Sequence, residues 1–366
     1  MPIVAAPFPA TLYFDITIDG NAFPFALHGK MQHGMNGARS FTCSVAGKEA
    51  LEMCRLGAIV EVNWGRGNLT NLIDDKTFVG IIKDLKPKAN MSTFTALDYT
   101  TFLAESQYVH YKVQDYVGRD LYFAAANECN YKGIDVTRLV QGSGLFITKN
   151  MDLFGWKTRK EFIDACFNEM KILVNDTNHP TNTIRQWQYA IREGKKMDFF
   201  LPDPDAIVNF PYVTLSEVKG NILDEAIVSN IDTTRIINAI TVASSKDETI
   251  YAQIEDSGSQ DKYGVIGKFL SYPSTDKNEL EDVAYKVLSR FKEPTVSYTV
   301  SLNNQDSLDI GDLIEIDVPS LPKETIKTVV GYEVSFGDSI TTRYQIGQPK
   351  VSIKEYIDLL KEPTDR

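Results

Sequence analysis

Cysteine and histidine are scarce in this sequence, which has four of each among its 366 residues. The cysteines, Cys43, Cys54, Cys129 and Cys166, form no Cys-x-x-Cys pair and stand in hydrophobic contexts. This spacing excludes the common zinc and dithiol redox motifs and predicts reduced thiols inside the core. Because the histidines are equally dispersed, we expect neither a metal site nor a cofactor.

Long apolar segments are also missing. No stretch approaches the roughly 18 consecutive apolar residues that a membrane helix needs. The N-terminus has neither the basic region nor the long apolar stretch of a signal peptide, so we expect a protein that folds and acts in a cytoplasm. With 43% hydrophobic residues, the chain can bury the cores of two or three domains.

Positive charge is in deficit. The sequence has 38 Lys and Arg residues against 49 Asp and Glu residues, a formal net charge of −11. This balance argues against stable binding of nucleic acid phosphates. An acidic surface can still line a passage through which DNA slides without sticking, because like charges repel.

The Gly-rich segments lack the neighbours that phosphate-binding and nucleophile motifs require. These segments are GRG at 65–67, QGSG at 141–144 and GDSI at 337–340. None has the Lys-Ser/Thr pair of a P-loop or the third Gly of a dinucleotide fingerprint. Ser143 lacks a Gly two residues before it and two after it, so it does not match a nucleophile elbow.

Residues 200–205, FLPDPD, contain two closely spaced carboxylates. Asp203 and Asp205 could in principle pair in a carbohydrate-cleaving site. They alternate with Pro202 and Pro204, however, and this alternation is typical of a rigid linker. We interpret the segment as a linker between domains.

The acidic segment SLDIGDLIEIDVPS, residues 307–320, is the first place to look for a metal or acid/base site. In an extended strand its Ile314, Ile316 and Val318 share one face, because successive side chains alternate. The opposite face then carries Leu313, Glu315 and Asp317. The pattern predicts a half-buried strand with a solvated acidic face.

A turn is predicted just before this strand. Gly311 reaches positive φ without strain, and the Asp312 carboxylate can hydrogen-bond to the local backbone. No His or Cys lies nearby, and the spacing matches no calcium-binding loop. We therefore expect Asp309, Asp312 and Glu315 to be solvent-facing residues of a turn and a strand, without a catalytic or metal-binding role.

Local patterns divide the chain into segments. Residues 1–105 alternate apolar and polar positions, with a hairpin turn at Asp19-Gly20, and predict a small antiparallel barrel or sandwich. Residues 106–205 predict a mixed α/β domain. This segment has helical patterns at 115–130 and 158–174, the second beginning with a capping box of Thr158 and Glu161.

Strands return from residue 206 and are interrupted by one long amphipathic helix at 276–293, which Asp276 and Glu279 can cap. Residues 206–349 form the predicted C-terminal domain. Residues 350–366 form a predicted amphipathic tail. The predicted fold class is α+β, mainly β.

The C-terminal third has an ordered series of elements. A strand with Asn238 (RIINAITV) precedes a predicted pair of polar strands (ETIYAQIEDSGSQDKYG), the long helix, the Gly-Asp turn between strands, and the closing pair KTVVGYEVSFGDSITTRYQIG. Near the N-terminus stand LGAIVEVNW, TFVGIIKDLKP and STFTALDYTTFLA. Over most of residues 50–347 the chain resembles the baseplate hub of tailed bacteriophages, a module that also forms the first part of type VI secretion spike proteins.

This resemblance implies two tube-like antiparallel β-barrel domains, at 1–105 and 206–349, with the mixed α/β domain between them. It implies a homotrimer in the baseplate of a contractile tail, which adapts the hexameric tail tube to a separate trimeric spike. The partners would be the tube protein, the spike, other baseplate proteins and DNA in transit. The resemblance makes Gly311 and Asp312 framework residues, implies no enzymatic activity, and places the protein in the virion after assembly in the host cytoplasm.

Two other functions remain open from the sequence. One is the distal tail hub of a non-contractile phage, although such hubs usually carry long host-binding extensions. The other is a cell-wall hydrolase, suggested by the many carboxylates. No arrangement of nucleophile, base and orienting group supports a hydrolase.

Overall fold

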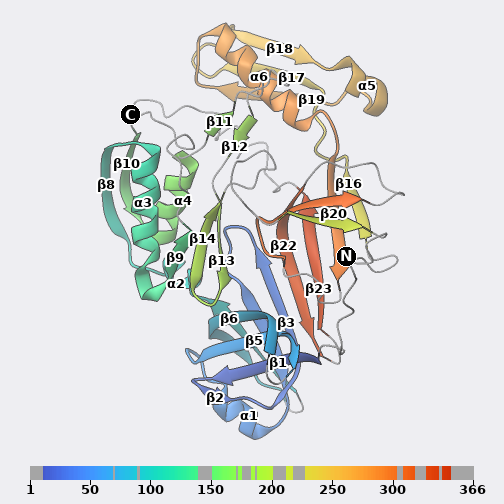
Figure 1. The fold of residues 1–366 in the computed structure, drawn as a ribbon. Coiled ribbons are helices and arrows are strands. Elements are labelled where there is room, and N and C mark those ends of the chain that lie inside the picture. Colours follow the sequence, from blue (N-terminus) through green and yellow to red (C-terminus); the bar gives the residue numbers. More distant parts are fainter. Residues whose placement is uncertain are drawn as a thin grey trace, which may run out of the picture.

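The computed structural model describes residues 11–68, 71–88, 91–138, 151–169, 172–174, 183–185, 188–200, 212–216, 227–302, 308–317, 327–337 and 340–347. The fold is α+β and mainly β, as the sequence predicts. One 13-stranded sheet forms the body of the molecule, and two smaller units with helices lie beside it and above it (Figure 1).

The N-terminal strands begin the large sheet. They are β1 (Thr11–Ile18), β2 (Asn21–Ala22), β3 (Ala26–Gly34), β4 (Ser40–Val45), β5 (Ile59–Asn68), β6 (Asn71–Lys86) and β7 (Ser92–Asp98), with helices α1 (Lys48–Met53) and α2 (Thr100–Ala104). Buried and half-buried residues alternate along β4 and β7, because one face of the sheet packs on the core. Asp19 and Gly20, at φ 50° and 77°, turn the chain between β1 and β2.

The middle of the chain forms the elements at the left and in the centre of Figure 1, which we call the middle unit. Its elements are β8 (Val109–Tyr116), α3 (Gly118–Cys129), the 3-10 helix η1 (Tyr131–Gly133), β9 (Asp135–Arg138), β10 (Met151–Lys157), α4 (Arg159–Glu169), β11 (Ile172–Val174), β12 (Thr183–Arg185), β13 (Gln188–Glu193) and β14 (Lys196–Phe200). The helix expected from residue 115 begins only at Gly118, because residues up to Tyr116 pair with β10. The Thr158 and Glu161 capping box is confirmed, with bonds of 2.7 and 3.2 Å between each side chain and the other's backbone N–H.

Most of the C-terminal strands belong to the large sheet, and a separate three-stranded sheet with two helices is inserted among them. The C-terminal elements are β15 (Tyr212–Ser216), β16 (Ile227–Asp232), β17 (Ala239–Ser244), β18 (Tyr251–Glu255), α5 (Ser257–Tyr263), β19 (Gly267–Tyr272), α6 (Lys277–Phe291), β20 (Thr295–Leu302), β21 (Leu313–Asp317), β22 (Lys327–Phe336) and β23 (Ile340–Gly347). Helix α6 carries the predicted apolar stripe, capped by the Asp276 side chain. The expected second polar strand after residue 255 is wrong: Asp256 accepts a hydrogen bond from Ser259 N–H and caps helix α5 instead.

The large sheet contains the same ladder twice. The first ladder has the order β3-β4-β7-β6-β5-β1 and the second has the order β16-β20-β23-β22-β21-β15, so each strand has a counterpart at the same place in the chain order. One pair differs, since β15 and β21 are parallel whereas β1 and β5 are antiparallel. The ladders join where β3 pairs with β22.

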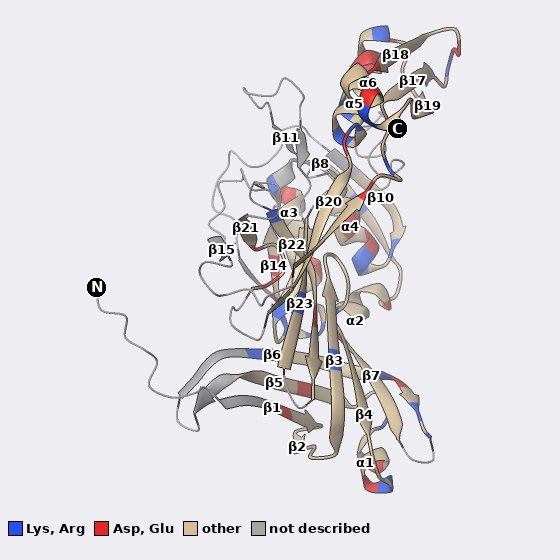
Figure 2. Ribbon diagram, turned by 90° about the vertical axis from the view of Figure 1, so that its right-hand side faces the viewer, with Lys and Arg blue, Asp and Glu red and all other residues tan. Residues whose placement is uncertain are grey.

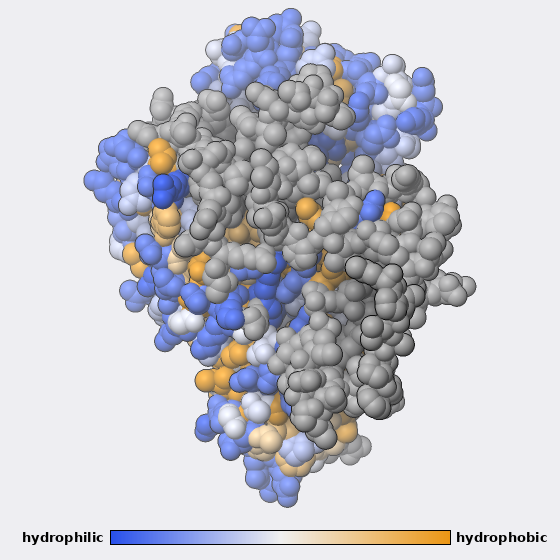
Figure 3. Space-filling model, in the orientation of Figure 1, coloured by the Kyte–Doolittle hydropathy of each residue, from blue (hydrophilic) through white to orange (hydrophobic). Residues whose placement is uncertain are grey.

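Three hydrophobic cores correspond to this arrangement. One core is shared by the strands of both ladders. The second lies in the middle unit, and the third packs α6 on the β18-β17-β19 sheet. We call the unit formed by β17, β18, α5, β19 and α6 the upper unit. It has a mostly hydrophilic surface (Figure 3). The domain boundaries at 105/106, 205/206 and 349/350 stay predictions. Of the linker predicted at 200–205, Phe200 belongs instead to β14 and is buried, while residues 201–205 and the tail at 350–366 lie outside the described residues.

Candidate functional site

The Gly311 turn lies at the junction of the second ladder and the middle unit. Gly311 has φ 85°, and its N–H donates to the Val329 carbonyl at 2.9 Å. The Asp312 carboxylate accepts a hydrogen bond from Asp309 N–H at 2.7 Å and lies 3.5 Å from the Arg192 guanidinium of β13. Arg192 also donates to the carbonyl of Ile310.

The expectation that these acids face solvent is wrong for Asp312, which is 2% exposed. The middle unit covers the turn, and the sequence pattern did not reveal this cover because it comes from residues more than a hundred positions away. Burial raises the pKa of Asp312 to about 6, against the opposing effect of Arg192. Glu315 and Asp309 are half-buried, and β21 is less exposed than predicted, since Leu313 on the acidic face is buried too.

A second buried charge joins the first ladder to the middle unit. Arg39 is fully buried, and its guanidinium donates to the carbonyls of Thr77, Arg192 and Gly194 at 3.0 to 3.3 Å. Its charge is balanced by Asp98, whose carboxylate lies 3.5 Å from Arg39 Nε and accepts the Arg39 backbone N–H at 2.8 Å. This arginine therefore fixes the β13–β14 hairpin against β6.

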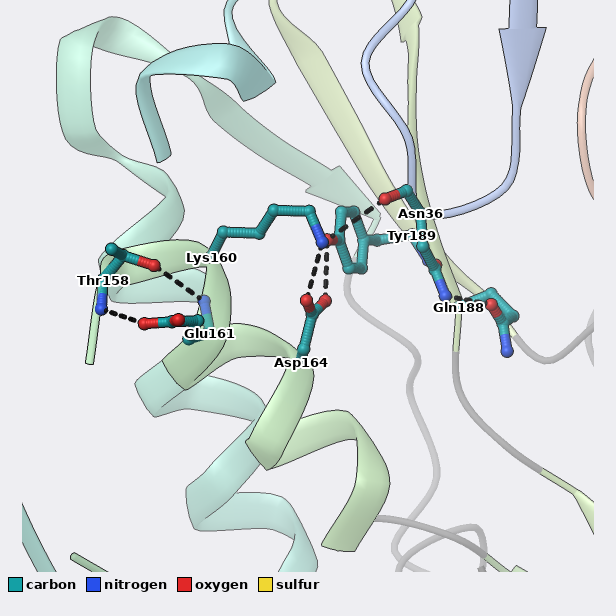
Figure 4. A network of polar contacts seen from close by, with 7 residues as sticks. All are labelled: Asn36, Thr158, Lys160, Glu161, Asp164, Gln188 and Tyr189. Atoms are coloured by element: carbon teal, nitrogen blue, oxygen red, sulfur yellow. Dashed lines mark hydrogen bonds and ion pairs between the residues drawn. The ribbon is translucent and has the colours of Figure 1, made fainter. Parts of the chain in front are cut away.

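A third contact supports the same junction (Figure 4). Asn36, in the β3–β4 connection, accepts the backbone N–H of Tyr189 at 3.0 Å through its side chain. The Tyr189 hydroxyl donates to Asp164 of α4 at 2.8 Å, and Lys160 donates to the same carboxylate at 2.6 Å. Together the three contacts make the junction a structural joint, because every charged group in it has a protein partner.

The candidate functional surface is the solvent side of the central strands. We call it the polar face. It comprises Thr299 and Ser301 of β20, Thr341, Arg343 and Gln345 of β23, Glu333 and Ser335 of β22, His28, Lys30 and Gln32 of β3, Ser40, Thr42 and Ser44 of β4, and Thr93, Thr95 and Leu97 of β7. Directly opposed residues in antiparallel strands point to the same side, so the face continues across the joint between the ladders.

The polar face is nearly neutral. Its few charges are grouped: Glu333 lies 2.9 Å from Lys30, accepts a hydrogen bond from Gln32 at 3.0 Å, and stands opposite Arg343. Burial alone would raise the pKa of Glu333, but these bonds and positive charges lower it below its usual value. Figure 2 shows these strands almost without the blue and red of charged residues.

The structure places the remaining predicted residues without bringing them into a site. Residues 65–67 lie in β5, while Ser143, Asp203 and Asp205 lie outside the described residues. Asn238 is fully buried and ties α5 to β19 through hydrogen bonds with Gly264 O and Ile266 N–H, both at 2.6 Å. The four cysteines are buried and form no disulfide with one another, and burial raises the pKa of Cys43 to about 12 and of Cys54 to about 11.

Across the described ranges, no group of three or more His, Cys, Asp and Glu side chains could hold a metal ion. In the same ranges, no helix is long and apolar enough to cross a membrane. The residues that sequence reasoning missed are Arg39, Arg192 and Asp98. Their only local signal was a charge beside an apolar strand, which does not distinguish a buried charge from an exposed one.

No protein-family model and no curated protein matches the sequence. Solved tail proteins nevertheless share the fold over nearly their whole length. A tail protein from Neisseria meningitidis MC58 is 12% identical, with a TM-score of 0.59 over 94% of this chain and 98% of that chain. The 43 kDa tail protein of prophage MuSo2 from Shewanella oneidensis is 12% identical, with a TM-score of 0.61 over 93% and 97%.

The same fold occurs in a chain of another protein complex. A chain of the Francisella PdpA–VgrG complex is 9% identical, with a TM-score of 0.54 over 93% of this chain and 60% of that chain. At these identities the likeness concerns the fold. The chain thus has the fold of phage tail proteins and of a chain of the PdpA–VgrG complex, and the resemblance inferred from the sequence is confirmed at the level of the fold.

Proposed function

We propose that this protein is the hub subunit of a phage tail baseplate. Three copies form a ring that adapts the sixfold tail tube to a trimeric central spike, and DNA passes along the ring axis. The protein acts as a structural adaptor without catalysing a reaction, and its stable partners are the tube protein, the spike and other baseplate proteins of a contractile tail.

The observation that carries this proposal is the duplicated ladder. One chain holds two six-strand ladders with matching strand orders, joined side by side through β3 and β22. Three chains related by threefold rotation therefore present six copies of one structural unit. Such a ring is compatible with a sixfold tube on one side and a threefold partner on the other.

The polar face suits the wall of a DNA channel. DNA carries about one charge per 1.7 Å of its axis, so a basic wall would hold it by counterion release. The Ser, Thr and Gln side chains of this face offer no such charge, and its Lys30 is paired with Glu333. The face carries only three charges, Glu333 with Lys30 and Arg343 beside it, although the net charge of the chain had suggested an acidic wall.

Imaging of assembled tails by cryo-electron microscopy tests the proposal. We expect three copies of the chain in one ring, directly below the last ring of the tube, with the polar face toward the axis. Six copies in the ring, or a single copy, would show that the duplicated ladder does not match the tube in this way. A ring of three with a wall of unpaired Lys and Arg would refute the channel assignment alone.

A further inference from the structure

The two ladders repeat each other down to single hydrogen bonds. In the first, Gly57 N–H donates to Ile82 O at 2.9 Å, and Ile82 N–H donates to the carbonyl of Ala58 at 3.0 Å. In the second, Gly311 N–H donates to Val329 O at 2.9 Å, and Val329 N–H donates to the carbonyl of the residue after Gly311, also at 2.9 Å. Both glycines have φ 85°. Ile82 and Val329 are therefore equivalent positions.

The equivalence continues through a bulge. The register with the next strand shifts between Ile82 and Asp84 in β6, and between Val329 and Gly331 in β22. Beyond the bulge, Asp84, Leu85 and Lys86 of β6 correspond to Gly331, Tyr332 and Glu333 of β22.

Pairing outward from these positions identifies the outer strands as counterparts. From Leu85 the register leads through β7 and β4 to Gly29 of β3. From Tyr332 it leads through β23 and β20 to Ile227 of β16. Four residues further along, Ile231 of β16 is thus the counterpart of His33 of β3.

The equivalence of the ladders allows two joints, β3 with β22 and β16 with β6, and the first of them is formed within the chain. Tyr332 of β22 stands opposite His33 of β3, and Glu333 stands opposite Gln32. The joint leaves Tyr332 only 4% exposed and His33 only 5% exposed, and their rings meet edge to face with centroids 5.4 Å apart.

The counterparts of these two segments have open edges. Among the described residues β16 pairs with β20 alone, and β6 beyond Ile82 pairs with β7 alone. Ile231 stands opposite Val296, which packs on the shared core, so it lies on the core side of the sheet. It is nevertheless 62% exposed, whereas its counterpart His33 is buried. An unpaired edge with an apolar residue on its core side is a template for strand addition.

We infer that β16 of one chain adds to the open end of β6 in the next chain as an antiparallel strand, with Leu85 opposite Ile231 and Lys86 opposite Asn230. The occupant of the edge is a second copy of this chain, because the β3–β22 joint already shows how the two strand types fit. The inference rests on the proposed ring and names its subunit interface. Three such joints alternate with three internal joints and close the ring.

The side chains at the inferred joint are compatible with pairing. Leu85 and Ile231 form an apolar cross-strand pair on the core side. Asp84 would stand opposite Asp232, where the internal joint has two glycines. Each of the two acids forms an ion pair within its own chain, since Lys86 lies 2.9 Å from Asp84 and Arg235 lies 3.6 Å from Asp232.

Cysteine cross-linking tests the register. The variant pairs are Leu85→Cys with Ile231→Cys, and Lys86→Cys with Asn230→Cys, each in one chain. Consecutive opposed pairs alternate in hydrogen bonding, so one of the two pairs occupies the closer, non-hydrogen-bonded position. Mild oxidation should give a covalent trimer of three times 41.1 kDa for that pair. Ile231→Cys with Tyr285→Cys, an exposed residue of helix α6, is the matched control and should stay monomeric on a denaturing gel.

The possible outcomes test the inferred strand pairing separately from the proposed threefold ring. A native trimer that neither pair cross-links would overturn the strand pairing and leave the proposed function intact. Cross-linked chains that grow beyond three would support the pairing and overturn the threefold ring. A chain that neither assembles nor cross-links, alone or in assembled tails, would overturn both.

A charge on the edge gives a second test. Ile231→Lys should abolish the native trimer without lowering the stability of the monomer, because the side chain is exposed in the single chain and Lys blocks strand addition. Val228→Lys is the matched control. Val228 is 55% exposed on the other side of β16, and its counterpart is Lys30, so this trimer should persist. Loss of the trimer in both variants or in neither would contradict the inferred orientation.

Discussion

At the residue scale, Gly57 and Gly311 have the same backbone but different surroundings. Both have φ 85°, where a residue with a side chain is strained by roughly 1–3 kcal/mol. A Cβ at Gly311 would also lie 2.6 Å from the Phe200 ring and 2.9 Å from Arg192, whereas a Cβ at Gly57 would meet nothing within 4 Å. The same backbone conformation therefore tolerates a side chain less well at Gly311 than at Gly57.

We predict that Gly311→Ala lowers the free energy of unfolding more than Gly57→Ala does, by a further 1–3 kcal/mol, roughly the cost of overpacking. Gly311→Val should be worse again, and worse than Asp309→Asn, Asp312→Asn or Glu315→Gln. Urea denaturation of the variants measures the difference. Equal losses for the two alanine variants would mean that Phe200 and Arg192 move aside freely.

The buried Asp312 predicts a pH dependence of stability. Its pKa is about 6 in the folded protein against 3.8 in its ordinary state, so the folded chain holds a proton that the unfolded chain releases. This contribution to stability is full below pH 3.8 and is lost as the pH rises through 6. At 1.36 kcal/mol per unit the loss amounts to about 3 kcal/mol.

Asp312→Asn removes this titration and keeps an oxygen that can accept the Asp309 N–H. The variant should therefore gain stability relative to the parent as the pH rises from 4 to 7. Denaturation midpoints at several pH values measure the gap between the two proteins. Glu315→Gln, at a half-buried carboxylate in the same strand, is the control, and a gap that is constant with pH would contradict the prediction.

At the element scale, the β13–β14 hairpin is held to the first ladder through Arg39. Removing one member of a buried pair leaves the other charge uncompensated, which typically costs 3–5 kcal/mol. We predict that Arg39→Met destabilises the chain by about that amount, because Asp98 is also fully buried. Arg39→Met with Asp98→Asn should recover part of the loss. A double variant whose loss equals the sum of the single losses would show that the pair is not coupled.

At the scale of the whole molecule, charge sets a condition on assembly. Three chains together carry a formal charge of −33, three times the −11 of each. This excess must be spread over solvated surfaces for the ring to form. The polar face, which carries few charges, is consistent with that condition, since the charges lie mainly elsewhere in the molecule (Figure 2).

We predict that Thr42→Lys with Thr95→Lys slows DNA release from assembled tails and makes it depend on salt, because six added cations in the ring would bind phosphates. Gln253→Lys with Ser271→Lys adds the same charge on the upper unit and is the control. Release kinetics at two salt concentrations measure the effect. Identical kinetics for both double variants would place the polar face away from the DNA path.

Elements whose signals are local could be predicted from the amino-acid sequence. The apolar stripe and cap of α6, the capping box at Thr158 and the alternation in β4 and β7 each lie within a few residues, and local geometry suffices to read them. The mainly β fold class followed from the same patterns. The family resemblance supplied the two-barrel expectation, which periodicity alone did not contain.

Which strand faces are covered and which edges are open depends on packing between distant segments, and these features became visible in the three-dimensional structure. Asp312 looked solvent-facing because its cover, Arg192 and Phe200, comes from another unit, and burial depends on contacts that local patterns do not encode. The matching registers of β6 and β22 likewise arise from pairing between distant segments. Side-chain periodicity sets the inner face of a strand, but long-range packing sets its neighbours, and those neighbours carry the inferred assembly.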